Sequence, residues 1–303
     1  MPATTLGRRP VPIVLAGALA IAFSAILYRY ADVSPSTGAF FRCLWALPPL
    51  WLLARLEDRR FGGRPARARH LAWLAGAFFA ADLILWHNAI EQVGAGLATV
   101  LGNTQVVLVA VAAWALLGEK PPRTAFAAIP VVGLGVLLIS GVLEEGAYGQ
   151  NPALGVLFGV LTGAAYTAFL LALREGNRDQ RRPAGPLFDA TLAATIGCGL
   201  YGALARDLDL TPTLGATAWL ILLALSAQVF GWLLISISLP RLPAALSSVM
   251  LTFQPLCAVV FAAILVDEDP SRLQLVGAAC ILAGLVIATV TRRPTPVAQP
   301  IQS

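Results

Sequence analysis

Apolar residues run along this chain in long stretches that are separated by short polar segments. A helix needs ~20 predominantly apolar residues to cross the hydrocarbon core of a bilayer, and these stretches are long enough to do so. We therefore expect ten membrane-spanning helices, near residues 12–30, 36–55, 71–91, 95–117, 123–142, 153–173, 185–205, 214–238, 244–266 and 272–291. Such helices use most of the 303 residues, so no sizeable soluble domain remains. The predicted fold class is an all-α integral membrane protein.

One segment of the chain is repeated. Residues 95–135 align without gaps with residues 244–284, and the identical pairs include Gln105/Gln254, Glu119/Glu268, Pro121/Pro270 and Arg123/Arg272. Apolar composition alone does not easily supply such polar matches at one constant offset. Two related halves with an odd number of spans each must lie in opposite orientations, as in transporters whose substrate site lies between the repeats. We expect two inverted five-helix repeats, residues 1–146 and 147–303, around a central cavity.

The distribution of basic residues predicts the orientation, because Lys and Arg are enriched in the cytoplasmic loops of membrane proteins. With the N-terminus inside, only Arg29, Arg206 and Arg272 of the 21 Lys and Arg residues fall on outer segments. Both termini are therefore expected in the cytoplasm, in a multi-pass protein of the cell inner (cytoplasmic) membrane. The basic residues lie on separate cytoplasmic turns, which indicates contact with anionic membrane lipid and not with nucleic acid.

Composition excludes several other functions. The chain is 58% hydrophobic and 12% charged, against roughly 25% charged residues in a soluble domain. Its four cysteines lie within predicted spans and are not closely spaced, which argues against a disulfide framework or a metal site. The sequence contains no H-E-x-x-H, no G-x-S-x-G and no Cys/His cluster. We therefore expect neither an enzyme nor a bound cofactor.

Polar residues in the middle of the spans are the candidates for substrate binding, because such groups are costly in the hydrocarbon core. Asp82 and Trp86 in the third span match Gln228 and Trp232 in the eighth. Each pair is four residues apart and shares a helix face, and Ser236 extends the second stripe. We expect Asp82 to face water, a partner or the cavity. The alternative for the two Trp residues is packing against lipid or neighbouring helices.

Two further polar sets lie in other spans. Thr99 and Asn103 in the fourth span are four residues apart, and so are their counterparts Ser248 and Thr252 in the ninth. These pairs either line the cavity or join neighbouring helices. The third set is Ser24 and Tyr28 in the first span with Tyr166 and Thr167 in the sixth. A buried tyrosine needs a partner for its hydroxyl, so cavity lining is one reading of this set.

Other polar residues within the spans are expected to have structural roles. Gln105 and Gln254 lie on a different face from the polar stripes, because two residues turn a helix by about 200°. Holding helices together is the favoured reading for them, with cavity lining as the alternative. Arg42 is expected to reach outward or to bind backbone carbonyls, and Asp189 to reach the cytoplasmic interface. His87 is expected to be a satisfied interior histidine, with a proton-linked role as the alternative.

The candidate substrate-binding residues share a place near mid-span, and His87 is included because it adjoins Trp86. They are Ser24, Asp82, Trp86, His87, Thr99, Asn103, Tyr166, Gln228, Trp232, Ser248 and Thr252. Glu119 and Glu268 lie at span ends and are expected to organise loops instead. No residue is predicted to be catalytic or to bind a metal.

Several stretches resemble a known family of membrane proteins. Leu85–Glu119 resembles the third and fourth spans of the drug/metabolite transporter superfamily in its EamA-like branch, and Ala244–Glu268 resembles the ninth, with Asp267 in place of the usual Gly. Phe41–Arg42 resembles the Arg-containing motif of the second span. Within the family, the chain is most similar to YddG-type exporters of aromatic and neutral amino acids. The resemblance implies ten spans, a cavity lined mainly by spans 1, 3, 4, 6, 8 and 9, and alternating access.

The predicted lining favours a small metabolite as the substrate. Aromatic surface suits an apolar or aromatic side chain, so we expect a secondary transporter that exports aromatic or neutral amino acids. The alternative is a proton-coupled exporter of lipophilic cations, for which Asp82 would be the central carboxylate. A phosphorylated-sugar exchanger would need Lys or Arg at cavity depth, and the spans contain only Arg42. The direction of transport rests on the resemblance, and the oligomeric state stays open, a monomer being compatible with the sequence.

Overall fold

The computed structural model describes residues 10–118, 123–176, 181–238 and 244–289, and this part of the chain is helical without a β-strand. Seven of its helical stretches are long and apolar enough to cross a membrane. They are Val11–Ala31, Pro35–Phe61, Ala66–Val93, Ala95–Leu116, Pro152–Gly176, Ala184–Ala205 and Leu214–Ile235. Three shorter apolar helices are Arg123–Ile139, Phe253–Leu265 and Arg272–Ala288. The helices lie where the hydropathy pattern predicts spans.

Several of the predicted spans are divided into shorter elements. The elements are α1 (Pro10–Ala22), α2 (Ser24–Ala31), α3 (Pro35–Leu44), α4 (Leu47–Phe61), α5 (Ala66–Val93), α6 (Ala95–Gly102), α7 (Gln105–Leu117), α8 (Arg123–Ile139), α9 (Pro152–Gly176), α10 (Ala184–Ala205), α11 (Leu214–Leu223), the π-helix η2 (Ala224–Gly231), α12 (Trp232–Ser238), α13 (Ala244–Leu265) and α14 (Arg272–Thr289). The first, second, fourth and eighth spans are thus interrupted or change their helix type within the membrane-length run.

Local sequence explains where several helices begin and turn. The Ser34 hydroxyl accepts a hydrogen bond from the Thr37 N–H at the start of α3, where Pro35 occupies the first turn. Such a cap satisfies a backbone N–H that has no partner within the helix. Gly94 lies between α5 and α6 with a φ of 87°, a conformation that favours glycine. The chain can therefore reverse between these two helices without a loop.

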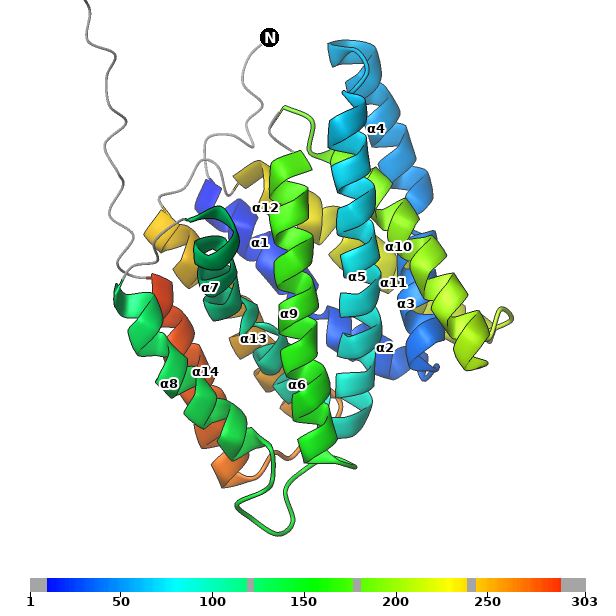
Figure 1. Cartoon of the computed structure of the whole chain (residues 1–303). Coiled ribbons are helices and arrows are strands. Elements are labelled where there is room, and N and C mark those ends of the chain that lie inside the picture. Colours follow the sequence, from blue (N-terminus) through cyan, green and yellow to red (C-terminus); the bar gives the residue numbers. More distant parts are fainter. Residues whose placement is uncertain (1–9, 119–122, 177–180, 239–243, 290–303) are drawn as a thin grey trace, which may run out of the picture.

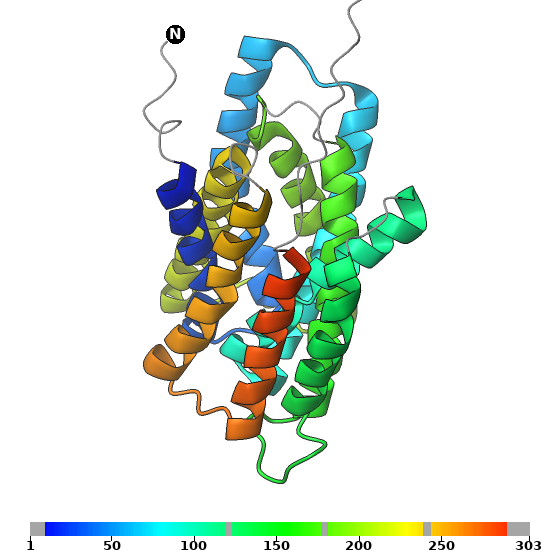
Figure 2. The same cartoon turned by 90° about the vertical axis from the view of Figure 1, so that its left-hand side faces the viewer.

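The helices pack in pairs around the centre of the bundle. α5 lies along α9, α8 lies along α14, α10 packs against α3, α4 and α5, and α6 packs against α13. Figure 1 shows α5 beside α9 and α8 beside α14, and Figure 2 brings α13 (orange) and α14 (red) to the front. At the α8–α14 crossing, a Cβ added to Gly135 would lie 2.6 Å from the carbonyl oxygen of Gly277. Small residues at such crossings let the two backbones approach closely.

Large apolar side chains remain exposed on the outer face of the bundle. Leu157 and Leu161 on α9 are exposed, as are Ile196, Leu200 and Leu204 on α10. Extended exposed apolar surface marks a site of contact with protein or membrane. On a bundle of membrane-length helices, these side chains are suited to face lipid.

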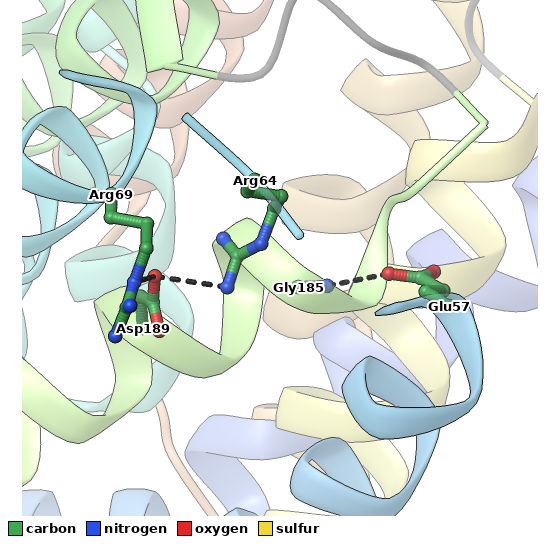
Figure 3. A network of polar contacts seen from close by, with 5 residues as sticks. All are labelled: Glu57, Arg64, Arg69, Gly185 and Asp189. Carbon is green, nitrogen blue, oxygen red and sulfur yellow. Dashed lines mark hydrogen bonds and ion pairs between the residues drawn. The ribbon is translucent and has the colours of Figure 1, made fainter. Parts of the chain in front are cut away.

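A polar network joins α4, α10 and the segment that precedes α5 (Figure 3). The Glu57 carboxylate accepts hydrogen bonds from the N–H groups of Ala184 (2.9 Å) and Gly185 (2.8 Å) at the start of α10. Asp189 pairs with Arg64 at 3.0 Å and with Arg69 at 3.7 Å. Asp189 thus lies against arginines just before and at the start of α5, and its place at the cytoplasmic interface stays a prediction. Asp189 is only 3% exposed, because two arginines that precede or begin α5 enclose the carboxylate.

Candidate substrate-binding site

A cavity of about 250 Å³ lies within the bundle. Residues from α1, α2, α3, α5, α6, α7, α9, α12 and α13 surround it, together with the α6–α7 junction. They are Ile21, Ser24, Arg42, Phe79, Asp82, Leu83, Trp86, Thr99, Gly102, Asn103, Gln105, Thr162, Tyr166, Leu170, Trp232, Ile235 and Gln254. The lining thus combines aromatic, neutral polar and charged side chains, which are the components of a small-molecule site.

Most of the candidates that the structure describes meet at this cavity. Those that line it are Ser24, Asp82, Trp86, Thr99, Asn103, Tyr166 and Trp232. Thr99 and Asn103 also bond to their own helix, through Ala95 O and Thr99 O, each at 2.8 Å. The side chains of Ser236, Ser248 and Thr252 lie outside the described residues. Tyr28 and Thr167 do not line the cavity: Tyr28 donates to Glu91, and Thr167 donates to a carbonyl of its own helix.

Aromatic rings form one wall of the cavity. The Trp232 ring lies 6.0 Å from the Tyr166 ring and 6.3 Å from the Phe79 ring, measured between centroids. Phe169 packs behind them, edge-on against Trp232 at 5.5 Å. Edge-on and tilted contacts at these separations are favourable because a ring edge is positive and a ring face negative. The wall is therefore held in place by its own packing before any substrate enters.

Arg42 and Asp82 bring opposite charges to the same cavity. The exposed fraction is 4% for Arg42 and 6% for Asp82. The Nε of Arg42 donates to Gln228 Oε1 at 3.3 Å, and the guanidinium carbon lies 5.5 Å from the centre of the Trp86 ring. The sequence-based expectation that Arg42 reaches outward or binds backbone carbonyls therefore differs from the structure. Partners on η2 and α5, which are distant in sequence, hold its side chain inside the bundle.

Gln228 and His87 were both among the candidates, but neither lines the cavity. Gln228 is buried against α3 and α10, where it accepts from Arg42 and donates to Thr191 Oγ1 at 3.2 Å. It lies in the π-helix η2, where its hydrogen bonds to Arg42 and Thr191 hold the side chain outside the cavity lining. His87 is fully buried, and its Nδ1 lies 2.6 Å from Leu83 O within α5. His87 is therefore interior as expected, but it is only half satisfied, because its Nε2 has no hydrogen-bond partner within the described part of the chain.

Besides Arg42, three polar residues line the cavity that were not among the candidates. For Gln105 and Gln254, the sequence favoured a role in joining helices. Gln105 instead faces the same cavity as Asn103 because α6 ends at Gly102 and α7 begins at Gln105, so the 200° separation of a continuous helix does not apply. Thr162 also lines the cavity, and its buried hydroxyl has no hydrogen-bond partner within the described part of the chain. The identity of Gln105 and Gln254 in the repeat was a signal that could have identified them.

The described residues contain no group of three His, Cys, Asp or Glu side chains that could hold a metal ion. The polar groups of the cavity come from several helices instead, and they can bind a small molecule through hydrogen bonds, charge and aromatic contact. The arrangement is thus suited to binding a small molecule. Among the lining residues, the titratable groups are Arg42, Asp82 and Tyr166.

Comparison with known proteins relates the chain to one family and to solved structures of a similar fold. A sequence profile described as the EamA-like transporter family matches the chain over residues 9–141 and again over residues 153–290. One solved protein chain, described as "Crystal structure of protein", matches with a TM-score of 0.63 and 14% identity, over 92% of this chain and 97% of that one. A likeness at that identity concerns the fold alone. No curated protein matches the chain.

Proposed function

Because the chain belongs to the EamA-like transporter family and is therefore a multi-pass membrane transporter of small molecules, we propose that it exports aromatic and other neutral amino acids by alternating access. We assign it to the inner (cytoplasmic) membrane with both termini in the cytoplasm, on the distribution of its basic residues. The composition of the central cavity is the observation that carries the proposed substrate class.

The cavity is suited to a compact molecule with an apolar side chain and a polar head. Trp86, Tyr166, Trp232 and Phe79 supply aromatic surface, which stacks well against an aromatic or branched side chain. Hydroxyl, amide and charged groups share the same space and can replace the water that the head of the substrate loses on entry. An amino acid carries both kinds of group within a few ångströms.

The proposed alternating access rests on ten spans in two inverted halves. Seven membrane-length and three shorter apolar helices are described, which supports ten. A Cβ at Gly135 would lie 2.7 Å from Ile281, and one at Gly284 would lie 2.5 Å from Val132. The alignment of the repeats pairs Gly135 with Gly284 and Val132 with Ile281. The Gly135–Ile281 contact therefore corresponds to the Gly284–Val132 contact in the other half. Such matched contacts are expected for halves related by a two-fold axis in the membrane.

The second candidate function is proton-coupled export of lipophilic cations. Asp82 favours it, because a carboxylate inside a membrane cavity can alternate between a proton and a cation. Arg42 in the same cavity disfavours it, since an arginine keeps its charge and repels a cationic substrate. Asp82→Asn separates the two functions: it should abolish cation/proton exchange, whereas amino-acid exchange that needs no proton should survive in part.

Counterflow with purified protein in proteoliposomes tests the proposal. The vesicles are loaded with unlabelled substrate, and uptake of labelled tryptophan, phenylalanine, leucine, threonine and lysine is followed, with ethidium movement measured in parallel. We expect saturable exchange of the aromatic and neutral amino acids. Ethidium movement driven by a pH gradient, without amino-acid exchange, would assign the second function instead.

A further inference from the structure

The cavity contains two side chains of opposite charge, Arg42 and Asp82. The role inferred for them here rests on the proposed amino-acid transport. Arg42 and Asp82 are both more than nine-tenths buried and line the same cavity. Within the described residues, no ion pair joins Arg42 to Asp82. By contrast, Arg64 and Arg69 do form ion pairs with Asp189. Two opposite charges thus face one space without neutralising each other directly.

Most of the hydrogen-bonding capacity of this pair is unused by the protein. Arg42 donates through Nε to Gln228, and within the described chain its terminal Nη groups have no hydrogen-bond partner. The Asp82 carboxylate likewise accepts no hydrogen bond from the described residues. A buried charged group whose hydrogen bonds are only partly made is costly unless another group meets it. The unused hydrogen-bond donors of Arg42 and acceptors of Asp82 therefore point to a ligand that binds both.

We propose that Arg42 and Asp82 form a two-charge clamp for a zwitterion, in which the Arg42 guanidinium binds the substrate carboxylate and the Asp82 carboxylate binds its ammonium group. Arg is suited to this role because its planar donors match a carboxylate two at a time. Gln228, itself held by Thr191, fixes the Nε edge and leaves the Nη edge for the ligand. The aromatic wall then receives the side chain of the substrate.

The clamp defines which molecules the site selects. A zwitterion satisfies both charges, whereas a simple cation leaves Arg42 unpaired and a simple anion leaves Asp82 unpaired. A site that is built to bind a charged group rejects an analogue without it, because its own buried group then stays unpaired. A hydrogen bond to a charged group contributes enough to predict about 10- to 100-fold weaker competition by an analogue that lacks one charge.

Competition in the counterflow assay tests the clamp with unaltered protein. Labelled phenylalanine uptake is measured against unlabelled phenylalanine, phenylalaninamide, which lacks the carboxylate, and phenylpropionate, which lacks the ammonium group. The assay is run at about pH 6, where the amino group of the amide is protonated. Both analogues should compete about 10- to 100-fold less well than phenylalanine. Equal competition by either analogue overturns the clamp while amino-acid transport stands, whereas absence of phenylalanine exchange overturns the proposed transport function itself.

Two variants then assign each charge to its residue. Arg42→Gln should lose the discrimination against phenylalaninamide and keep that against phenylpropionate, and Asp82→Asn should do the reverse. Arg55→Gln is the matched control, because Arg55 also lies over a Trp ring, that of Trp51, but outside this cavity. If Arg42→Gln still rejects the amide as strongly as the unaltered protein, the assignment of the carboxylate to Arg42 is wrong. The comparison of analogues on the unaltered protein decides the clamp even where a variant fails to fold.

Discussion

Trp86 and Trp232 each lie four residues after a polar residue, Asp82 and Gln228, and both line the cavity. Trp86 lies under the Arg42 guanidinium, and Trp232 packs against Tyr166. Aromatic rings of this size supply large contact area in a fixed orientation. At the scale of single residues, these two side chains and the two charges are therefore expected to decide how well a substrate binds.

We predict that Trp86→Ala and Trp232→Ala each lower amino-acid counterflow at least about tenfold, because each removes aromatic surface worth more than about 1.4 kcal/mol to a stacked substrate. Trp51→Ala is the control, since Trp51 is 48% exposed and lies outside the cavity. The amount of monodisperse protein should be similar for all three variants. Normal transport by both cavity variants would remove the Trp residues from the site.

Asp189 offers a test of stability at the same scale. Removing one partner of a buried ion pair costs about 3–5 kcal/mol, because the other charge stays buried. Asp189→Ala leaves the largely buried Arg64 side chain without its ion-pair partner, whereas the Arg69 side chain is exposed. The variant should therefore have a thermal midpoint in detergent that is lower by several degrees. Arg67→Ala is the matched control: its pair with Glu175 is exposed, and exposed pairs contribute about 0–1 kcal/mol. Equal midpoints for the two variants would show that Asp189 is not structurally important.

At the scale of elements, one carboxylate connects two distant parts of the bundle. Glu268, in the loop between α13 and α14, accepts hydrogen bonds from Ala95 N (2.5 Å) and Gly96 N (3.1 Å) at the start of α6. Gly94 makes room for it, because a Cβ there would lie 2.8 Å from the Glu268 carboxyl group. The expectation that Glu268 organises a loop agrees with this contact. Its counterpart Glu119 lies outside the described residues.

The Glu268 contact predicts a dependence of stability on pH. Burial raises the pKa of Glu268, and the N–H groups of Ala95 and Gly96 only partly oppose that rise. Folding therefore favours the protonated form, so the stabilising contribution is complete below the ordinary pKa of 4.5 and is lost as the pH rises through the raised value. We compare the thermal midpoints of the unaltered protein and of Glu268→Gln. The advantage of the unaltered protein should decrease as the pH rises from about 4 to about 8.

The control for this measurement is Glu145→Gln, because Glu145 is exposed in the loop that follows α8. It should show no comparable trend with pH. A difference for Glu268→Gln that grows as the pH rises would mean that the two N–H groups outweigh burial, and would reverse the sign.

At the scale of the whole molecule, the pairing of helices reflects the proposed duplication. α8 packs with α14, and α6 packs with α13, and each of these pairs joins corresponding spans of the two proposed halves. α5 packs with α9, which joins the third span to the sixth, and α1 packs with η2 and α12, which joins the first span to the eighth. Exchanging the two proposed halves turns one of these contacts into the other. A transporter built so can change the accessible side by rocking one half against the other.

Cysteine labelling tests the orientation that this arrangement requires. In a variant without the four native cysteines, single cysteines replace Gly63, Gly146 or Asp209, which are all exposed. An impermeant thiol reagent should label positions 146 and 209 in intact cells, and position 63 only after the membrane is permeabilised. Labelling of positions 63 and 146 from the same side would contradict the proposed topology.

The amino-acid sequence was enough to predict the membrane class, the positions of the helices and several of the residues that line the cavity. It could do so because a bilayer forces the backbone of each span to bond within its own helix, so hydropathy alone locates the spans, and because polar groups such as Asp82 and Asn103 are costly at mid-depth unless they face the interior. Which face a side chain presents follows from sequence only while the helix is regular.

The tertiary structure decided the remainder. Hydrogen bonds to Arg42 and Thr191 hold Gln228 outside the cavity lining, and the interruption between α6 and α7 brings Gln105 into it. Arg42 lies inside because Gln228 and Trp86 hold it there, contacts between residues far apart in the chain. Helix irregularities and long-range pairings depend on the packed bundle as a whole, and for that physical reason no local pattern in the sequence could reveal them.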